Sequence, residues 1–344
     1  MTAPQALALC AAALTHGNGQ IDLTNRAALQ LRGVRDGQWR PLIETLVDLE
    51  LVEADPAREA RRLLLVDPDW VAGDDSHRVA TELLARVHEL PALPGKIGYA
   101  VDAGPRRMLH AAPGDFRIER AADGGLILRL DGRAHGVSVP IDEAVTALIA
   151  LAHWFVESGG AAAGRAVRHR APLPAWAEGP IQPAAAGEAP CPGPHRLGAV
   201  YGLPFGQVDA DRLAMLVARP GASAVRLTPW RLLLVEGLAC DPARGFVTDP
   251  ASPLMRIDAC AGAPACPQGA IETRTIARRL APCLSGRSLH VSGCAKGCAR
   301  AAAADIVVTG HGGRFGLSFG ARASDPPHES GFDPDQLLGR LGAH

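Results

Sequence analysis

Apolar and polar positions follow the same order twice along this chain. Residues 2–34 contain a helical run, a turn at 16–19, and a Leu-Thr sequence that leads into an apolar stretch ending in glycine. Residues 208–238 repeat this order, with the turn at 219–221. Because helical and extended segments alternate in both stretches, the pattern predicts two related units that mix helices and strands.

Further elements are expected in the same order in both halves. A helix is expected over residues 38–51 in the first half and after Cys266 in the second. Strand pairs are expected at 95–102 with 115–130, and at 288–292 with 305–319. An internal duplication of this kind predicts a pseudo-twofold molecule with a site at the interface between its halves. The alternative is two similar domains whose sequences match by chance.

Composition narrows the class of partner. The net charge is −1, so no global basic field favours nucleic acid. All basic residues but Lys96 and Lys296 are arginine, whose planar fork suits carboxylates. No stretch reaches the roughly 18 apolar residues of a membrane span, and the N-terminal segment lacks the basic start of a signal peptide. We therefore expect a cytoplasmic protein with reduced thiols and no membrane partner.

Four cysteines form two tight pairs near the C-terminal end. Cys260 and Cys266 are separated by five residues, and Cys294 and Cys298 by three. The intervening residues are mostly Gly, Ala and Pro, which allow a bulky cofactor to approach the backbone. Four thiolates in this arrangement are what a [4Fe–4S] cluster requires, with one ligand per iron. The pattern therefore predicts a cluster held by these four residues.

Other interpretations of the cysteines stay open. A zinc site also uses four thiolates, although a spacer of five residues is long for one of its pairs. Disulfides would need an oxidising compartment, and inert buried thiols are common. The remaining cysteines lack partners at ligand spacing and are expected to be core or surface residues: Cys10, Cys191, Cys240 and Cys283.

The two halves differ at the loop that follows the first strand of each expected pair. In the second half this loop carries Cys294 and Cys298, whereas in the first half residues 102–107 are basic and contain no cysteine. This difference predicts a cluster on one side of the molecule and an anionic ligand on the other.

The paired cysteines, the duplication and the motif at residues 23–33 resemble the sulfite/nitrite reductase superfamily. Within it, the sequences around 258–266 and 290–299 resemble the precorrin-3B synthase family. The resemblance implies an α+β fold, a pseudo-twofold duplication of ferredoxin-like half-domains and sulfite-reductase-like domains. The implied boundaries are 1–64 for the first half-domain, apparently truncated at its N-terminus, 65–155 for the first α/β domain, 156–196 for a Pro/Gly/Ala-rich linker, 197–248 for the second half-domain, and 249–344 for the cluster-binding domain.

The resemblance also implies an activity and its partners. The reaction would be a monooxygenation of precorrin-3A at C20 with O2, accompanied by closure of a γ-lactone. The cluster would be joined by a mononuclear non-haem iron or by sirohaem, and Cys298 would be the bridge to a sirohaem iron. Reducing equivalents would derive from NADH through a separate reductase, because no dinucleotide fingerprint follows a strand here.

Tetrapyrrole-binding residues are implied by the same resemblance, on positions that match the motifs. A polycarboxylate substrate needs cations and amide donors, and the candidates are Arg26, Arg32, Arg62, Lys96, Asn25 and Gln30. Arg106 or Arg107 is a further candidate. Gly98 replaces a second lysine of the reductases, which argues against oxyanion reduction. His290 and His311 could ligate iron, but no catalytic residue is identified from the sequence.

Two alternatives to this activity stay open. One is a sirohaem-dependent sulfite or nitrite reductase. The other is a cluster-bearing electron carrier or decayed paralogue, because the first half lacks a strand that the second half has near residues 197–205. That lack would leave an unpaired sheet edge.

Overall fold

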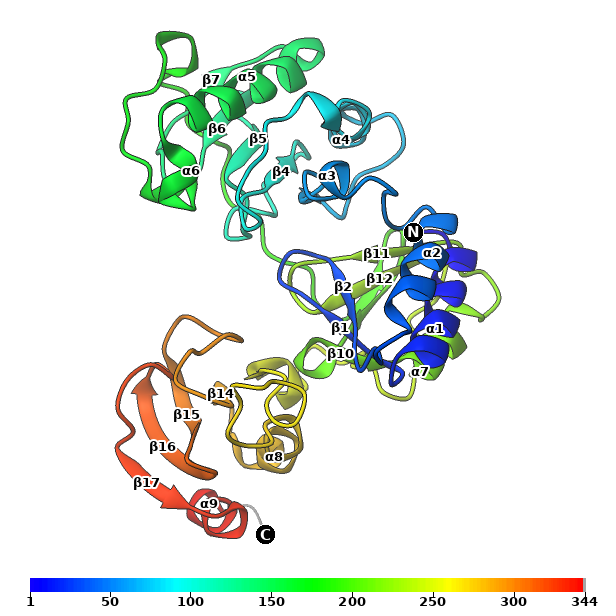
Figure 1. The fold of residues 1–344 in the computed structure, drawn as a ribbon, viewed down its shortest axis with the longest axis vertical. Coiled ribbons are helices and arrows are strands. Elements are labelled where there is room, and N and C mark those ends of the chain that lie inside the picture. The colour runs from blue at the N-terminus through cyan, green and yellow to red at the C-terminus, as the bar shows by residue number, and fades with distance from the viewer. Residues whose placement is uncertain (343–344) are drawn as a thin grey trace.

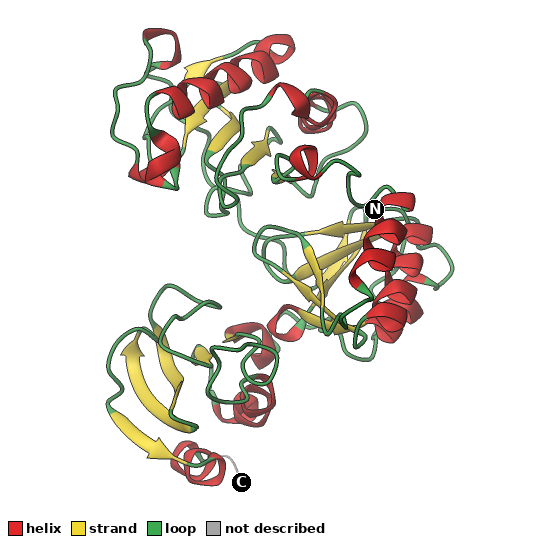
Figure 2. Cartoon of the chain, in the orientation of Figure 1, coloured by secondary structure: helices red, strands yellow, loops and turns green. Residues whose placement is uncertain are grey.

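The computed structural model describes residues 1–342, which form three parts (Figure 1). Two α/β domains lie at opposite ends of the view, and the two half-domains lie between them. In the half-domains the helices α1, α2 and α7 gather on one side of the strands (Figures 1 and 2). No helix of these residues is long and apolar enough to cross a membrane.

Two half-domains of similar order form the central part. The first contains α1 (Ala3–His16), β1 (Gln20–Leu23), β2 (Leu29–Leu31) and α2 (Trp39–Asp48). The second contains β8 (Gly193–His195), β9 (Gly198–Gly202), β10 (Gln207–Asp209), α7 (Ala210–Val217), β11 (Val225–Leu227) and β12 (Leu232–Glu236). A reciprocal capping box between Thr2 and Gln5 begins α1, because it satisfies backbone N–H groups that the first turn leaves unpaired.

The two half-domains share one core. Strand β1 pairs with β2 on one side and with β10 of the second half on the other, with Ile21 opposite Val208. Apolar residues of α1, β1, α7 and β11 pack in a single cluster that includes Ala6, Leu213 and Val225. The half-domains are therefore one folding unit rather than two.

The second half-domain has its own sheet, of order β11-β12-β9-β8. Strand β9 lies inside this sheet, at the segment expected near residues 197–205. The first residues of the chain lie beside β11, where Thr2 bridges Ala224 and the Met1 amino group donates to the Val225 carbonyl at 3.0 Å.

The first α/β domain is a five-stranded sheet of order β3-β4-β5-β6-β7. Its elements are α3 (Pro56–Glu59), β3 (Leu64–Val66), α4 (Asp75–Ala85), β4 (Tyr99–Asp102), β5 (Phe116–Arg120), β6 (Leu126–Leu130), β7 (Val137–Ser138), α5 (Ala144–Glu157) and α6 (Gly160–Ala163). The first three strands are parallel and the last two are antiparallel to their neighbours. Helices α4 and α5 bury their apolar faces against Tyr99, Phe116 and Leu128.

The second α/β domain repeats this topology, with order β13-β14-β15-β16-β17. Its elements are β13 (Ile257–Ala259), α8 (Arg274–Leu280), β14 (Leu289–Ser292), β15 (Ala304–His311), β16 (Arg314–Ala321), β17 (Glu329–Phe332) and α9 (Pro334–Leu341). Strand directions match those of the first domain. The predicted duplication is thus present in the strand order of both halves.

The segment predicted as a linker lies along the first α/β domain. It includes the short helix α6 and two single 3₁₀ turns, Ala166–Arg168 and Ala175–Ala177. Isolated bridges join it to that domain at Ala186 with Arg107, Pro183 with Ala121, and Ile181 with Gly136. After these contacts the chain returns to the half-domains at β8.

Candidate functional site

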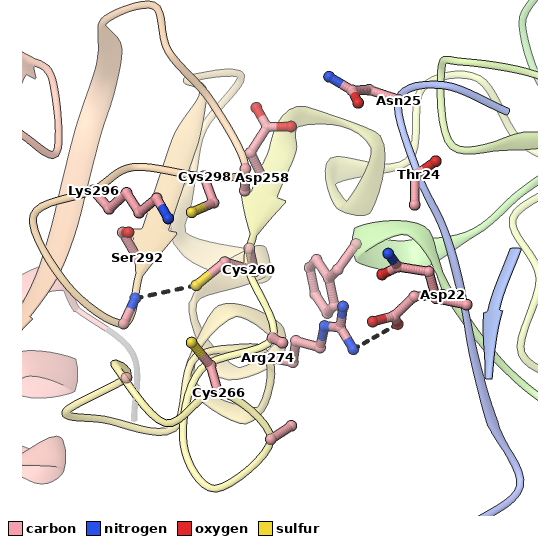
Figure 3. A pocket seen from close by; sticks show the side chains of 18 of the residues that line it. Asp22, Thr24, Asn25, Asp258, Cys260, Cys266, Arg274, Ser292, Lys296 and Cys298 are labelled. Atoms are coloured by element: carbon pink, nitrogen blue, oxygen red, sulfur yellow. Dashed lines mark hydrogen bonds and ion pairs between the residues drawn. The ribbon is translucent and has the colours of Figure 1, made fainter. Parts of the chain in front are cut away.

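One cavity of about 710 Å³ lies where the half-domains meet the second α/β domain (Figure 3). Its walls come from the β1–β2 segment, from the turn before β12, and from the loops after β13 and β14. All four paired cysteines line it: Cys260, Cys266, Cys294 and Cys298. The two pairs that are separated along the chain therefore face the same space.

The topology of the sheet brings the two cysteine loops together. Cys260 directly follows β13, and Cys294 lies two residues after the end of β14. Because β13 and β14 are parallel neighbours, their carboxyl ends lie at the same edge of the sheet. Backbone hydrogen bonds connect the two loops, including one from the Ala270 N–H to the Gly293 carbonyl at 2.8 Å.

Glycines let the loops approach closely. Gly262 has φ +62°, a conformation that favours glycine. A Cβ atom on Gly293 would lie 3.2 Å from the Cα atoms of both Gly262 and Gly269 and 3.7 Å from the Cys260 Sγ. The Gly293 N–H also donates to that Sγ at 3.2 Å. The backbone thus already directs a donor at one of the four sulfurs, and there is no side chain at this contact.

The donor set fits a [4Fe–4S] cluster by its chemistry. It supplies four thiols, small residues around them, and an N–H group directed at sulfur. Within residues 1–342, no three His, Cys, Asp or Glu side chains lie close enough together to hold a single metal ion. A cluster instead takes one thiolate for each iron.

Two aspartates organise the arginines around the cavity. Asp22 on β1 is 4% exposed and contacts Arg32 Nε at 2.7 Å and Arg274 Nη1 at 2.9 Å. Asp258 on β13 contacts Arg231 Nη2 at 3.2 Å and Arg300 Nη1 at 3.0 Å. Each carboxylate therefore neutralises part of an arginine pair and fixes its direction.

Asp22 connects the first half-domain to the cysteine loops. Arg274 begins α8, and the preceding Thr273 donates its hydroxyl to the Cys260 carbonyl at 2.5 Å. Figure 3 shows the Arg274 guanidinium reaching across to Asp22. The geometry of the Cys260 loop thus depends on a residue from the opposite half of the sequence.

Three of the predicted substrate residues line the cavity and three do not. Asn25, Gln30 and Arg32 are among its walls. Arg26, Arg62 and Lys96 are not part of the cavity lining. Arg62 contacts Glu59 at 3.0 Å, and Arg26 donates to the Lys96 carbonyl at 3.3 Å. Burial lowers the pKa of Arg26, with repulsion from Arg165 adding to the shift and Asp115 opposing it.

The other candidates from the sequence have structural surroundings. Arg107 donates to the Ala184 carbonyl at 3.0 Å and contacts the buried Glu119 at 3.4 Å, while Arg106 is exposed. His311 is exposed at the end of β15. His290 is fully buried on β14, and burial lowers its pKa. Neither ring nitrogen of His290 has a hydrogen-bond partner in the described part of the chain.

Sequence reasoning missed several residues of the cavity wall. They are Asp22, Trp230, Arg231, Asp258, Arg274 and Lys296. The duplication could have predicted two of them, Trp230 and Arg231. The Leu-Thr sequence that precedes Asn25 recurs just before these two residues. The others depend on contacts between distant segments, which the pattern of apolar positions does not report.

Comparisons with known proteins agree with this architecture. Residues 1–49 match the nitrite/sulfite reductase ferredoxin-like half domain. The solved structure of the Mycobacterium tuberculosis NirA protein superposes with a TM-score of 0.60 and 18% identity, over 98% of this chain and 76% of that one. The duplicated strand order and the paired half-domains therefore define a protein with the sulfite/nitrite reductase fold.

A sequence relative narrows the assignment. A precorrin-3B synthase from Sinorhizobium sp. is 33% identical over 99% of this chain and 82% of its own length. The chain belongs to the precorrin-3B synthase family.

Proposed function

We propose that this protein is an oxidoreductase of cobalamin biosynthesis that acts on precorrin-3A. The reaction is an O2-dependent hydroxylation at C20 with closure of a γ-lactone. One observation carries the proposal: a single cavity combines the four paired cysteines with amide and guanidinium groups of the opposite half-domain. Family membership supports the substrate class, because the relative is named as a precorrin-3B synthase.

Cys260, Cys266, Cys294 and Cys298 would hold a [4Fe–4S] cluster. When bound, the cluster supplies one-electron transfer at the cavity wall. The Gly293 N–H, which already donates to Cys260 Sγ, would stabilise negative charge on the sulfurs. Cys298 would be the bridge to the iron of a sirohaem.

The opposite wall would bind the substrate. Tetrapyrroles of this class carry acetate and propionate groups, and arginine recognises carboxylates through paired N–H donors. Arg32 is held in place by Asp22 and by the Gln30 amide oxygen, to which it donates at 2.8 Å, and its remaining N–H donors lie at the cavity with the amide of Asn25. Trp230 and Phe205 add aromatic surface against which a macrocycle can pack.

The remaining predicted residues would act further from the cysteines. Arg26 and Lys96 lie together, joined by the hydrogen bond from the guanidinium to the lysine carbonyl. They would contact carboxylates at the periphery of the substrate, whereas Arg62 is engaged with Glu59. Electrons derived from NADH would arrive through a separate reductase protein.

Isotope labelling tests the proposal. Purified protein that contains iron and sulfide is incubated with precorrin-3A, NADH, a reductase and ¹⁸O2, and the product is analysed by mass spectrometry. The expected product gains one ¹⁸O atom as the C20 hydroxyl. An unlabelled product, or no turnover by protein with a full cluster, would refute the activity.

The reductase alternative has its own signature. The similarity to the NirA fold keeps a sirohaem enzyme as the second candidate. Sirohaem in the purified protein, together with reduction of sulfite or nitrite and no conversion of precorrin-3A, would replace the proposed function with that one. The assay uses reduced methyl viologen as donor, so it does not depend on finding the physiological reductase.

A further inference from the structure

One cation in the cavity wall lacks the acidic partner that the others have. The lining contains Arg32, Arg231, Arg274 and Lys296. The three arginines are each paired with Asp22 or Asp258. Lys296 is exposed at the cavity rim, and across residues 1–342 it forms neither an ion pair nor a side-chain hydrogen bond.

The position of Lys296 is set by the cysteines themselves. It lies midway between Cys294 and Cys298, and Gly297 turns the loop with φ +62°. A hydrogen bond of 2.7 Å from the Ser292 hydroxyl to the Cys294 carbonyl holds the start of the loop. In Figure 3 the Lys296 side chain extends along this loop, and its amine is directed to the side on which Cys298 lies.

Both acids of the cavity lining are already paired with arginines. Asp22 contacts Arg32 and Arg274, and Asp258 contacts Arg231 and Arg300. The anionic groups left for Lys296 on its own loop are the thiolates, which carry negative charge whenever they bind metal. One-electron reduction of a cluster at this point adds a further negative charge without making or breaking a bond.

We propose that Lys296 is the charge partner of the sulfur site and that its ammonium group raises the reduction potential of the cluster. The inference rests on the cluster of the proposed function. A cation beside the ligands stabilises the reduced form more than the oxidised form, because the reduced form carries one more negative charge. The three lining arginines differ from it, because each is directed at Asp22 or Asp258, which offsets part of its charge, whereas Lys296 has no such partner.

Redox titration of charge variants tests the proposal. Lys296→Gln, Lys296→Arg and the wild type are purified with measured iron and sulfide, titrated with dithionite, and followed by electron paramagnetic resonance. Lys296→Gln is expected to bind the electron at least tenfold more weakly, a fall of about 59 mV for a one-electron couple. Lys296→Arg keeps the charge and is expected to stay close to the wild type.

An arginine outside both proposed binding regions provides a control. Arg170→Gln removes a positive charge from an exposed residue outside the cavity lining, and the potential is expected to stay unchanged. A second variant, Ala295→Lys, adds a cation on the same loop and is expected to raise the potential. It keeps the test valid if Lys296→Gln loses its cluster.

Several results would overturn the inference. A wild-type potential in Lys296→Gln, or no rise in Ala295→Lys, would do so. Weaker binding of the tetrapyrrole by Lys296→Gln at an unchanged potential would assign the lysine to the substrate instead. Wild-type protein without iron and sulfide after anaerobic reconstitution would refute the cluster itself, which separates that failure from failure of the charge effect.

Discussion

The two α/β domains have the same strand order, but different residues follow the carboxyl ends of their first two strands. Register places Val66 of β3 beside Val101 and Ala259 of β13 beside Val291, so Asp67 occupies the position of Cys260. On the neighbouring strand Asp102 corresponds to Ser292. Where one domain presents cysteine sulfurs to a cavity, the other buries two carboxylates.

The two buried carboxylates of the first α/β domain accept hydrogen bonds from the backbone of their own loops. Asp102 is fully buried and accepts the N–H groups of Met108 at 2.9 Å and Leu109 at 2.7 Å. Asp67 accepts the Asp69 N–H at 2.9 Å. The loop after β4 is therefore folded onto acidic side chains. Of the two arginines in its basic sequence, Arg107 contacts Glu119 and Arg106 is exposed, so the anionic ligand stays a prediction.

A second contrast concerns the links between the halves. Asp22 and Arg226 occupy equivalent positions in the duplicated motif and carry opposite charge. Asp22 binds Arg274 of the second α/β domain, whereas Arg226 donates to the Pro68 and Trp70 carbonyls at 2.8 and 2.5 Å in the first. Each half-domain strand thus holds the α/β domain of the opposite half.

The largest effect is expected from breaking the cysteine side of the comparison. Cys294→Ser removes one of the four thiolates, so iron and acid-labile sulfide should fall from about four each per chain to a small fraction of that. Colorimetric analysis after anaerobic reconstitution measures this. Cys191→Ser, which changes an exposed cysteine outside the cavity, should keep the full content. Full loading of Cys294→Ser would show that Cys294 is not a ligand.

The ion pair between Asp22 and Arg274, which joins the first half-domain to the second α/β domain, should affect the retention of the cluster. Asp22→Ala leaves two arginines without their carboxylate and should cost about 2–3 kcal/mol, because Asp22 is buried while Arg32 remains partly solvated. Since Arg274 follows the Cys260 loop, the cluster should also be lost faster on exposure to a chelator. Urea unfolding and the rate of bleaching in EDTA measure the two effects. A wild-type bleaching rate would separate the link from the cysteine loop.

The equivalent residue in the other half provides the contrast. Arg226→Ala removes two hydrogen bonds to carbonyls and the ion pair with Glu236 at 2.5 Å. It also removes the stacking over Trp70, whose ring centroid lies 4.0 Å from the guanidinium carbon. The expected cost is about 2 kcal/mol. The rate of cluster bleaching should not change, because this link holds the domain without cysteines. Equal bleaching rates in Arg226→Ala and Asp22→Ala would contradict the claim that Asp22, and not Arg226, holds the domain with the cysteines.

The smallest effect concerns the acidic side of the comparison. Burial raises the pKa of Asp102 to about 7, against the opposing hydrogen bonds from Leu109 and Met108, and burial raises that of Asp67 to about 6. Since these values exceed the roughly 3.9 of an unfolded aspartate, the associated stability is present below about pH 4 and is lost as the pH rises through the folded pKa.

Urea unfolding between about pH 5 and about pH 8 checks this dependence. The free energy of unfolding should decrease with rising pH in the wild type, and the slope should be smaller in Asp102→Asn. The exposed Asp36→Asn serves as the control and should keep the wild-type slope. A slope in Asp102→Asn as steep as in the wild type would assign the dependence to other groups.

The sequence by itself determined the elements and their repetition. The expected helix over 38–51 is α2, Trp39–Asp48. The expected strand pairs, 95–102 with 115–130 and 288–292 with 305–319, are β4 beside β5 and β14 beside β15, but the second segment of each pair is a hairpin of two strands. Such features follow from periodicity within short segments. The two short-spaced pairs Cys260/Cys266 and Cys294/Cys298 predicted one shared site, and all four residues line the same cavity.

Only the tertiary structure decided how the halves are joined and which polar residues face the cavity. The pairing of β1 with β10 merges two predicted half-domains into one core, and Asp22 meets Arg274 only because their sheets are packed together. Arg26, Arg62 and Lys96 were predicted together with Arg32, but only Arg32 lines the cavity with the cysteines. Contacts of this kind arise between segments that are far apart in the chain, so no local pattern of apolar and polar residues encodes them.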